Sequence, residues 1–216
     1  MYNERRALLR ELYALRKSDP PLLSGTEVTK ILVAGMGIPA LEHMDLLRRC
    51  IAEVKSRPQA LQSGGPRIFL WGNAMDDTAF VELVEGSGAH VVMDDLCTGT
   101  RFFWDDVPET SDPLEGLAQR YLYVHCPRSH VPMKEGREPD LENRYGYMDG
   151  FIKDWKASGA IFYIVRFCDT CELEGPDLRE YLSDKGIPVL MIEDDYSTST
   201  IGQLRTRVQA FLEIME

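Results

Sequence analysis

The residues best suited to chemistry lie in the segment 167–171, which reads Phe-Cys-Asp-Thr-Cys. Cys168 directly follows a continuous apolar run, and Cys171 comes three residues later. Thiolates bind iron and zinc, and a Cys-x-x-Cys pair can also work as a redox dithiol. Glu172 and Glu174 disfavour a thiolate here, and the glycine and proline spacer of thioredoxins is absent. A buried structural thiol, a redox pair and a metal ligand therefore all remain open.

Two further cysteines, Cys97 and Cys126, also follow segments that could end at a site. Together with Cys168 and Cys171 they could form a four-thiolate metal site. The spacing does not resemble a zinc ribbon, which needs two close cysteine pairs. Taken alone, Cys97 and Cys126 are interpreted as structural, and Cys50 as a core residue of a helix. Five cysteines are an odd number, so a disulfide framework is not expected in a chain of this size.

Carboxylates and arginines provide weaker candidates. Aspartate and glutamate side chains that follow two apolar runs could act as acid, base or ligand, although loop aspartates are commonly solvated or capping. The four histidines show no ligand spacing, and no phosphate-binding glycine motif follows a strand. Two arginines in the first turns of the closing helix could hold an anion. These candidates are Asp94, Asp95, Glu193, Asp194, Asp195, Arg205 and Arg207.

The elements that must position these residues are four apolar runs separated by helical patterns. The runs cover residues 67–71, 90–93, 160–167 and 187–192. Unbroken apolar strands that alternate with helices predict a parallel sheet covered on both faces. We therefore expect an α/β fold with a four-stranded, doubly wound sheet, flavodoxin-like or Rossmann-like. Ligands of such sheets bind beyond the carboxyl ends of the strands, where Cys97 and Cys168 are expected.

The remaining chain reads as helices and loops. Three helices without an intervening strand make residues 1–60 a helical lead-in, and residues 61–216 form the α/β lobe. A segment with several prolines, residues 125–139, is expected to be a loop. The predicted helices cover residues 2–17, 26–38, 40–55, 76–85, 113–123, 141–157, 176–183 and 201–216.

Charge and hydropathy exclude several classes of partner. The 216-residue chain has a formal net charge of −11, which argues against nucleic acid or an anionic membrane as the main partner. An anionic ligand such as a coenzyme A ester would need locally placed arginine or lysine. The apolar runs are too short to span a bilayer, and the polar start shows no secretory signal. A cytoplasmic location is expected.

The sequence resembles the 2-hydroxyacyl-CoA dehydratase and benzoyl-CoA reductase subunit family, which includes the D-component of 2-hydroxyglutaryl-CoA dehydratase. The resemblance rests on several segments that occur in the same order. No single segment is decisive, but together they extend over nearly the whole chain. The segments are Tyr2–Arg6, Arg67–Gly72, Gly88–Gly99, Asp112–Glu115, Cys126-Pro127, Phe167–Asp169, Gly186–Pro188, Ile192-Glu193 and Gly202–Glu213.

The resemblance implies a subunit with two similar α/β lobes and a [4Fe–4S] cluster between them. Two cluster thiolates are expected from the first lobe and one from the Phe-Cys-Asp strand end of the second, which is Cys168 here. Cys97, Cys126 and Cys171 are weaker candidate ligands. An ATP-dependent activator protein would supply one electron at low potential for ketyl radical chemistry on an acyl-CoA thioester.

The sequence departs from the family because only the second lobe is recognisable. A partner, either the first lobe or a paralogous subunit, is therefore expected, and the isolated chain is expected to be inactive and without a stable cluster. Two alternatives remain: a non-catalytic α/β interaction module, and a thiol redox protein that uses Cys168 and Cys171.

Overall fold

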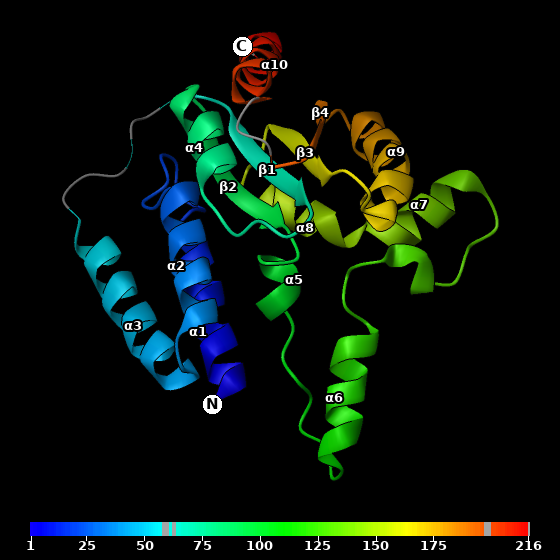
Figure 1. Cartoon of the computed structure of the whole chain (residues 1–216). Coiled ribbons are helices and arrows are strands. Elements are labelled where there is room, and N and C mark those ends of the chain that lie inside the picture. The colour runs from blue at the N-terminus through cyan, green and yellow to red at the C-terminus, as the bar shows by residue number, and fades with distance from the viewer. Residues whose placement is uncertain (58–60, 62–63, 197–199, 216) are drawn as a thin grey trace.

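The computed structural model describes residues 1–57, 61, 64–196 and 200–215. Among these residues, four parallel strands form one sheet in the order β2-β1-β3-β4 (Figure 1). The predicted α/β fold with a four-stranded parallel sheet and an N-terminal helical segment is therefore confirmed. Residues 60 and 216, which bound the predicted lead-in and the predicted closing helix, lie outside the described residues. The strands are β1 (Arg67–Gly72), β2 (His90–Asp95), β3 (Gly159–Val165) and β4 (Val189–Asp194).

Helices surround the sheet and account for most of the remaining chain. Residues 128–130 add a short 3-10 turn. The helices are α1 (Tyr2–Ala14), α2 (Gly25–Gly37), α3 (Ala40–Ser56), α4 (Ala79–Gly86), α5 (Thr100–Phe103), α6 (Pro113–Leu122), α7 (Arg137–Tyr145), α8 (Tyr147–Asp154), α9 (Asp169–Asp184) and α10 (Ile201–Ile214).

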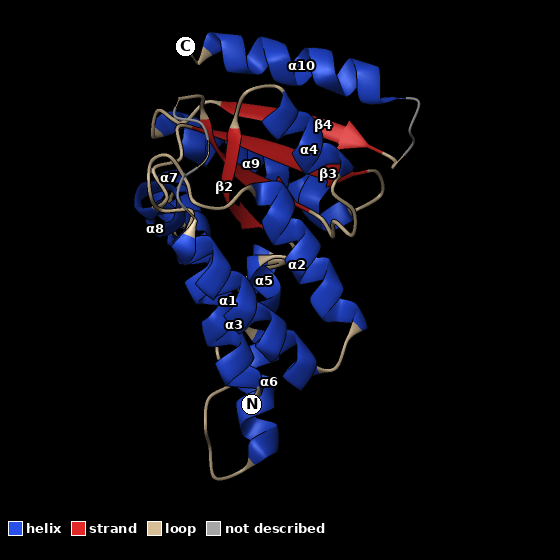
Figure 2. Cartoon of the chain, turned by 90° about the vertical axis from the view of Figure 1, so that its left-hand side faces the viewer, coloured by secondary structure: helices blue, strands red, loops and turns tan. Residues whose placement is uncertain are grey.

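The two faces of the sheet are covered by different helices. Along β3, Ile161 and Tyr163 pack in the cluster that also contains residues of α4 and α10. Phe162 and Ile164 point to the opposite face and pack with residues of α1, α2, α3, α7, α8 and α9. Figure 2 shows α10 on one side of the sheet and the N-terminal helices on the other. Because both faces are buried, the central strands are apolar without interruption, which is the pattern seen in the sequence.

Two helical predictions were wrong in their limits. The helix expected from Pro176 begins at Asp169, so Pro176 lies inside α9. Proline disfavours a helix interior, but α9 has acidic residues in its first turn and a buried face that overrides this preference. The single helix expected over 141–157 is two helices, α7 and α8, which meet at Gly146. A Cβ at Gly146 would lie 2.6 Å from the Glu142 carbonyl oxygen, so the close approach of the chain at this junction leaves no room for a side chain.

The start of α2 is held by a carboxylate from another helix. Glu85, at the end of α4, accepts hydrogen bonds from the Gly25 and Thr26 amides at 2.7 and 3.0 Å and from the Thr26 hydroxyl at 2.7 Å. The side chain of Ser24 accepts a further bond from Glu27 in a capping box. The first amides of a helix lack partners within the helix, so Glu85 provides partners from outside it.

Glu85→Ala is therefore expected to lower the free energy of unfolding by about 1–3 kcal/mol, because it leaves partly buried donors at the start of α2 without their partner. Chemical denaturation monitored by circular dichroism measures this change. The matched control is Glu82→Ala in the same helix, whose exposed ion pair with Lys30 should be worth less than about 1 kcal/mol. Equal losses in the two variants would contradict the capping role of Glu85.

Within the described residues, no helix is long and apolar enough to cross a membrane.

Candidate functional site

The candidate site lies at the carboxyl edge of the sheet, where the parallel strands end side by side. The central strands β1 and β3 are neighbours, and β2 and β4 flank them. The connection from β1 leads to β2 on one side, and the connection from β3 leads to β4 on the other. The edge between β1 and β3 is therefore the switch point where ligands of doubly wound folds bind. Cys97 lies in the loop after β2, and Cys168 lies just beyond the end of β3. The sequence placed both cysteines at this edge correctly.

A buried ion pair forms the centre of the site. Arg101, in α5, donates two hydrogen bonds to the carboxylate of Asp95 at the end of β2, both at 3.1 Å. Its third nitrogen donates to the carbonyl oxygen of Gly72 at 2.9 Å. Asp95 is 0% exposed and Arg101 is 5% exposed. The guanidinium is thus fixed between the ends of β1 and β2, where it provides a positive charge in a protein of net negative charge.

Aromatic rings extend this arrangement toward α8. The Tyr147 hydroxyl donates a hydrogen bond to Asp95 at 2.8 Å, and burial raises the pKa of this tyrosine well above its usual value. Its ring lies against His125, with 4.1 Å between the ring centroids. The guanidinium carbon of Arg128 lies 4.9 Å from the same ring. Burial lowers the pKa of His125, so this imidazole favours the neutral form.

The thiols of Cys97 and Cys126 meet beside Arg101. A side-chain hydrogen bond joins the two sulfur atoms, and an Arg101 nitrogen lies 3.6 Å from Cys97 Sγ. The hydrogen bond from Cys126 and the positive charge of Arg101 lower the pKa of Cys97 to about 6, although burial and Asp95 act in the opposite direction. The hydrogen bond to Cys97 and burial raise the pKa of Cys126. Cys97 therefore has more thiolate character than Cys126.

Alkylation of Cys97 by iodoacetamide is expected to follow a titration with an apparent pKa near the value of about 6 set by its neighbours. The thiolate is the nucleophile, so the rate should rise through that pH and reach a plateau near neutrality. Peptide mass spectrometry measures each cysteine separately. Cys50 serves as an internal control, because burial raises its pKa and should move its titration to higher pH. A half-maximal rate for Cys97 at about pH 8.5, the value of an ordinary thiol, would contradict the role of Arg101.

The turn that carries Cys168 is strained and exposed. β3 ends at Val165, two residues earlier than the sequence predicted, and Phe167 has a φ of 68° with a side chain that is 91% exposed. Residues other than glycine rarely adopt this left-handed backbone conformation. Cys168 follows as the N-cap residue of α9 and is half-buried. This backbone conformation leaves the Phe167 side chain exposed and places Cys168 at the edge of the sheet.

Cys171 differs from Cys168 in its environment. It is 0% exposed, and burial together with the neighbouring Cys168 raises its pKa to about 12. Such a thiol stays protonated at neutral pH and is a poor nucleophile. The Cys-x-x-Cys pair therefore offers no thiolate at Cys171, while the structure gives thiolate character to Cys97 instead.

In the part of the chain that the structure describes, no three or more cysteine, histidine, aspartate or glutamate side chains are grouped to hold a metal ion. The four candidate cysteines form two pairs, Cys97 with Cys126 and Cys168 with Cys171, each joined by a side-chain hydrogen bond. A [4Fe–4S] cluster is held by several thiolates, so the residues of this chain do not by themselves fit a complete cluster site.

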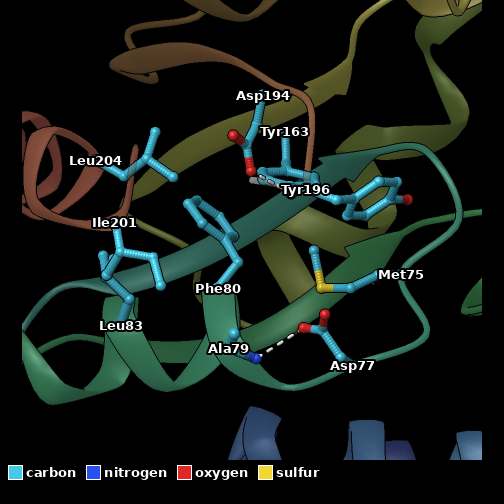
Figure 3. A pocket seen from close by; sticks show the side chains of 10 residues that line it. All are labelled: Met75, Asp77, Ala79, Phe80, Leu83, Tyr163, Asp194, Tyr196, Ile201 and Leu204. Atoms are coloured by element: carbon cyan, nitrogen blue, oxygen red, sulfur yellow. Dashed lines mark hydrogen bonds between the residues drawn. The ribbon is translucent and has the colours of Figure 1, made fainter. Parts of the chain in front are cut away.

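The strand-end carboxylates serve mainly as structural acceptors. Asp94 accepts hydrogen bonds from the Tyr13 hydroxyl and from the Thr100 amide, and burial raises its pKa. Asp194 accepts from the Tyr163 hydroxyl at 2.7 Å and from Thr200 at 3.0 Å. Asp194 and Tyr163 line a pocket of about 80 Å³ between α4 and α10, which is too small for a coenzyme A thioester (Figure 3).

Three of the remaining charged candidates are also engaged, and the fourth, Arg205, is exposed on α10. Glu193 and Asp195 form exposed ion pairs with Arg166 at 2.9 and 3.1 Å. Arg207 donates to the Met191 carbonyl oxygen at 2.6 Å, which ties the closing helix to β4. The sequence reasoning missed the roles of Arg101 and Tyr147, although the position of Arg101 shortly after a strand end was a usable signal.

Comparison with known proteins shows relatives along the whole chain. Residues 1–215 match the 2-hydroxyglutaryl-CoA dehydratase, D-component family. The chain is 26% identical over 216 residues to the (R)-phenyllactyl-CoA dehydratase beta subunit of Clostridium sporogenes, covering 100% of this chain and 55% of that protein. It is 25% identical over 215 residues to a benzoyl-CoA reductase subunit of Thauera aromatica, covering 99% of this chain and 54% of that protein.

A third relative is the beta subunit of (R)-2-hydroxyglutaryl-CoA dehydratase from Acidaminococcus fermentans, which is 26% identical over 213 residues, or 99% of this chain and 55% of that protein. The chain thus spans about half the length of these curated relatives. The family match extends over residues 1–215. The chain belongs to the 2-hydroxyglutaryl-CoA dehydratase, D-component family.

Proposed function

We propose that the chain is the C-terminal lobe of a 2-hydroxyacyl-CoA dehydratase or benzoyl-CoA reductase-type subunit. The enzyme would act on an acyl-CoA thioester by one-electron chemistry that passes through a ketyl radical. Cys168 would donate one thiolate to a [4Fe–4S] cluster whose other ligands come from a second lobe. The observation that carries the proposal is the family match over residues 1–215, together with the position of Cys168 at the carboxyl edge of the sheet.

Cys168 suits a ligand that is shared between two bodies. It is half-buried, and it packs against the larger core cluster at the end of β3. Cys171 suits a ligand shared with a second lobe less well, because it is 0% exposed and packs inside the larger core cluster. The free thiols of Cys97 and Cys126 interact with each other beside Arg101 and are not assigned as ligands in this proposal. One ligand from this chain is therefore the assignment that the geometry supports.

Exposed apolar side chains support the need for a partner. Helix α6 projects from the body of the protein (Figure 1), and Leu114, Tyr121 and Leu122 on it are each more than 60% exposed. Near the cysteines, Phe167 and Leu173 are 91% and 77% exposed. Apolar side chains of this size, gathered on projecting elements, indicate a protein interface. The partner in this proposal is the other lobe or a paralogous subunit.

The proposal includes two further partners. An ATP-dependent activator protein would deliver the electron, and an acyl-CoA would be the substrate. When bound, the cluster would supply electron transfer, while the residues of this chain hold the edge at which it sits. Arg101 keeps a fixed positive charge there, and Tyr147 with Asp95 fixes the guanidinium in place. The complex would be cytoplasmic.

Phe167→Gly is expected to weaken binding of the complementary lobe while leaving the stability of the chain nearly unchanged. Glycine relieves a left-handed strain of about 1–2 kcal/mol but adds freedom to the unfolded chain, so the free energy of unfolding should change by less than about 1 kcal/mol. Loss of a phenyl ring that the partner would cover should weaken binding of the complementary lobe by about 10–100-fold. Isothermal titration calorimetry measures the binding. Ile214→Ala, an exposed apolar change on α10, should leave it unchanged, and equal effects of both changes would contradict the assigned interface.

The proposed function is tested by cluster reconstitution with iron and sulfide under anaerobic conditions. The isolated chain should bind no stable cluster. The same chain, produced together with the part of the Clostridium sporogenes beta subunit that it does not match, should bind about four iron atoms and absorb near 400 nm. About four iron atoms on the isolated chain would overturn the shared-ligand proposal, and a folded complex without iron would do the same.

A further inference from the structure

The pair formed by Cys97 and Cys126 has no role in the proposed cluster chemistry, yet it has the features of a reactive dithiol. The two residues come from separate segments, one between β2 and α5 and the other between α6 and the 3-10 turn. Their sulfur atoms share a hydrogen bond. Cys97 is exposed and Cys126 is half-buried. The pair therefore combines direct contact between the sulfurs with access from solvent.

A fixed cation stands beside this pair. The Arg101 nitrogen that lies 3.6 Å from Cys97 Sγ also donates to the Gly72 carbonyl oxygen at 2.9 Å. The other nitrogens of the guanidinium are held by Asp95, which is completely buried. The guanidinium cannot turn away from Cys97 without breaking these bonds. A positive charge next to a sulfur atom stabilises the thiolate, which is the attacking form in disulfide exchange.

The second pair in the site differs in access and in charge. Cys171 is 0% exposed and lies in the first turn of α9. Its sulfur contacts Cys168, and burial is the main reason that its pKa is raised. An oxidant from solvent would thus reach Cys97 before Cys171. The sequence motif pointed to the Cys-x-x-Cys pair, whereas access and charge favour the pair that is distant in sequence.

We propose that Cys97 and Cys126 form a reversible disulfide by exchange with small-molecule disulfides of the glutathione type. The Cys97 thiolate attacks one sulfur of the small disulfide, which forms a mixed disulfide and releases one small thiolate. Cys126 then attacks the Cys97 sulfur, forms the internal disulfide and releases the second small thiol, which takes the proton of Cys126. Two protein sulfurs lose two electrons in total, and the small disulfide gains them.

The expected result of oxidation is a link between two parts of the site. Cys126 lies in the segment that follows α6, and Cys97 lies in the turn after β2. A disulfide would join the end of the projecting α6 segment to the edge of the sheet. It would also remove the thiolate that faces Arg101. The reduced and oxidised chains would therefore differ in the surface beside Cys168.

The disulfide is tested on the reduced chain, equilibrated with mixtures of reduced and oxidised glutathione, acid-quenched, alkylated and digested for mass spectrometry. The expected product has lost about 2 Da, the mass of two hydrogens, and yields one linked peptide pair that contains Cys97 and Cys126. Reduction with excess glutathione should reverse it. The same treatment in denaturant provides a control, because the unfolded chain should link its five cysteines without this preference.

Variants make the assignment specific. Cys97→Ser and Cys126→Ser should each abolish the internal disulfide, while Cys168→Ser should leave it unchanged. Far-ultraviolet circular dichroism of each variant verifies that the fold is retained, which is expected because Cys97 is exposed. A link between Cys168 and Cys171, a persistent glutathione adduct on Cys97, or no oxidation in the folded chain would each overturn the proposal. No iron is used, so the result is independent of the cluster assignment.

Discussion

Asp95→Asn is expected to lower the free energy of unfolding by about 3–5 kcal/mol, because it leaves the buried charge of Arg101 without its counter-ion. The carboxylate accepts two hydrogen bonds from Arg101 and one from the Tyr147 hydroxyl, and it is 0% exposed. An amide can accept only through its single oxygen and carries no charge. For a chain of this length, the loss corresponds to a drop of about 6–20 °C in the thermal midpoint.

Calorimetry and denaturant titration measure this loss. The matched control is Glu193→Gln, which removes a carboxylate from an exposed ion pair with Arg166 and should cost less than about 1 kcal/mol. The two variants make the same chemical change at buried and exposed positions. If Asp95→Asn cost no more than the control, the ion pair would not organise the carboxyl edge of the sheet.

Gly72→Ala is expected to cost about 3 kcal/mol or more through backbone strain and a steric clash. Gly72 ends β1 with a φ of 155°, and a Cβ there would lie 1.9 Å from the carbonyl oxygen of Tyr163 in β3. The neighbouring strand would have to move away, which would also displace the Gly72 carbonyl oxygen that accepts from Arg101. The backbones of β1 and β3 thus approach each other closely at the edge that carries the candidate site.

Gly86→Ala is the matched control for this change. Gly86 ends α4, and a Cβ at that position would meet no atom within 4 Å. Alanine there should be neutral or stabilising by up to about 1 kcal/mol, because it reduces the freedom of the unfolded chain. Thermal unfolding of both variants distinguishes a local clash from a general intolerance of alanine. A mild effect at Gly72 would mean that β1 and β3 can separate without loss.

The strands could be predicted because their pattern is local. The apolar runs of β1 and β3 are buried on both faces, so their composition alone predicts these two strands without any knowledge of their neighbours. The limits of α9 could not be predicted in the same way. Local propensity places a helix start at Pro176, while the buried face of α9 extends the helix back to Asp169. Tertiary packing decided this boundary.

In the candidate site, too, some features follow from the local sequence pattern and others depend on tertiary packing. The position of Cys168 at a strand end follows from the order of strands and from the rule for doubly wound sheets. The meeting of Cys97 and Cys126 depends on the path of the segment between α5 and α7, which has few periodic signals. The burial of Cys171 depends on how α9 packs against the sheet. Spacing in the sequence therefore identified candidate thiols but not the partners that set their reactivity.

The shared-ligand proposal is decided by the iron content of the two-lobe complex when Cys168 is replaced. The chain carrying Cys168→Ser is combined with the complementary part of the Clostridium sporogenes beta subunit and reconstituted as above. Cys50→Ser, in α3, is the control. We expect an assembled complex that has lost its cluster with Cys168→Ser and keeps about four iron atoms with Cys50→Ser. A full complement of iron on the Cys168→Ser complex would contradict the assignment of Cys168 as a cluster ligand.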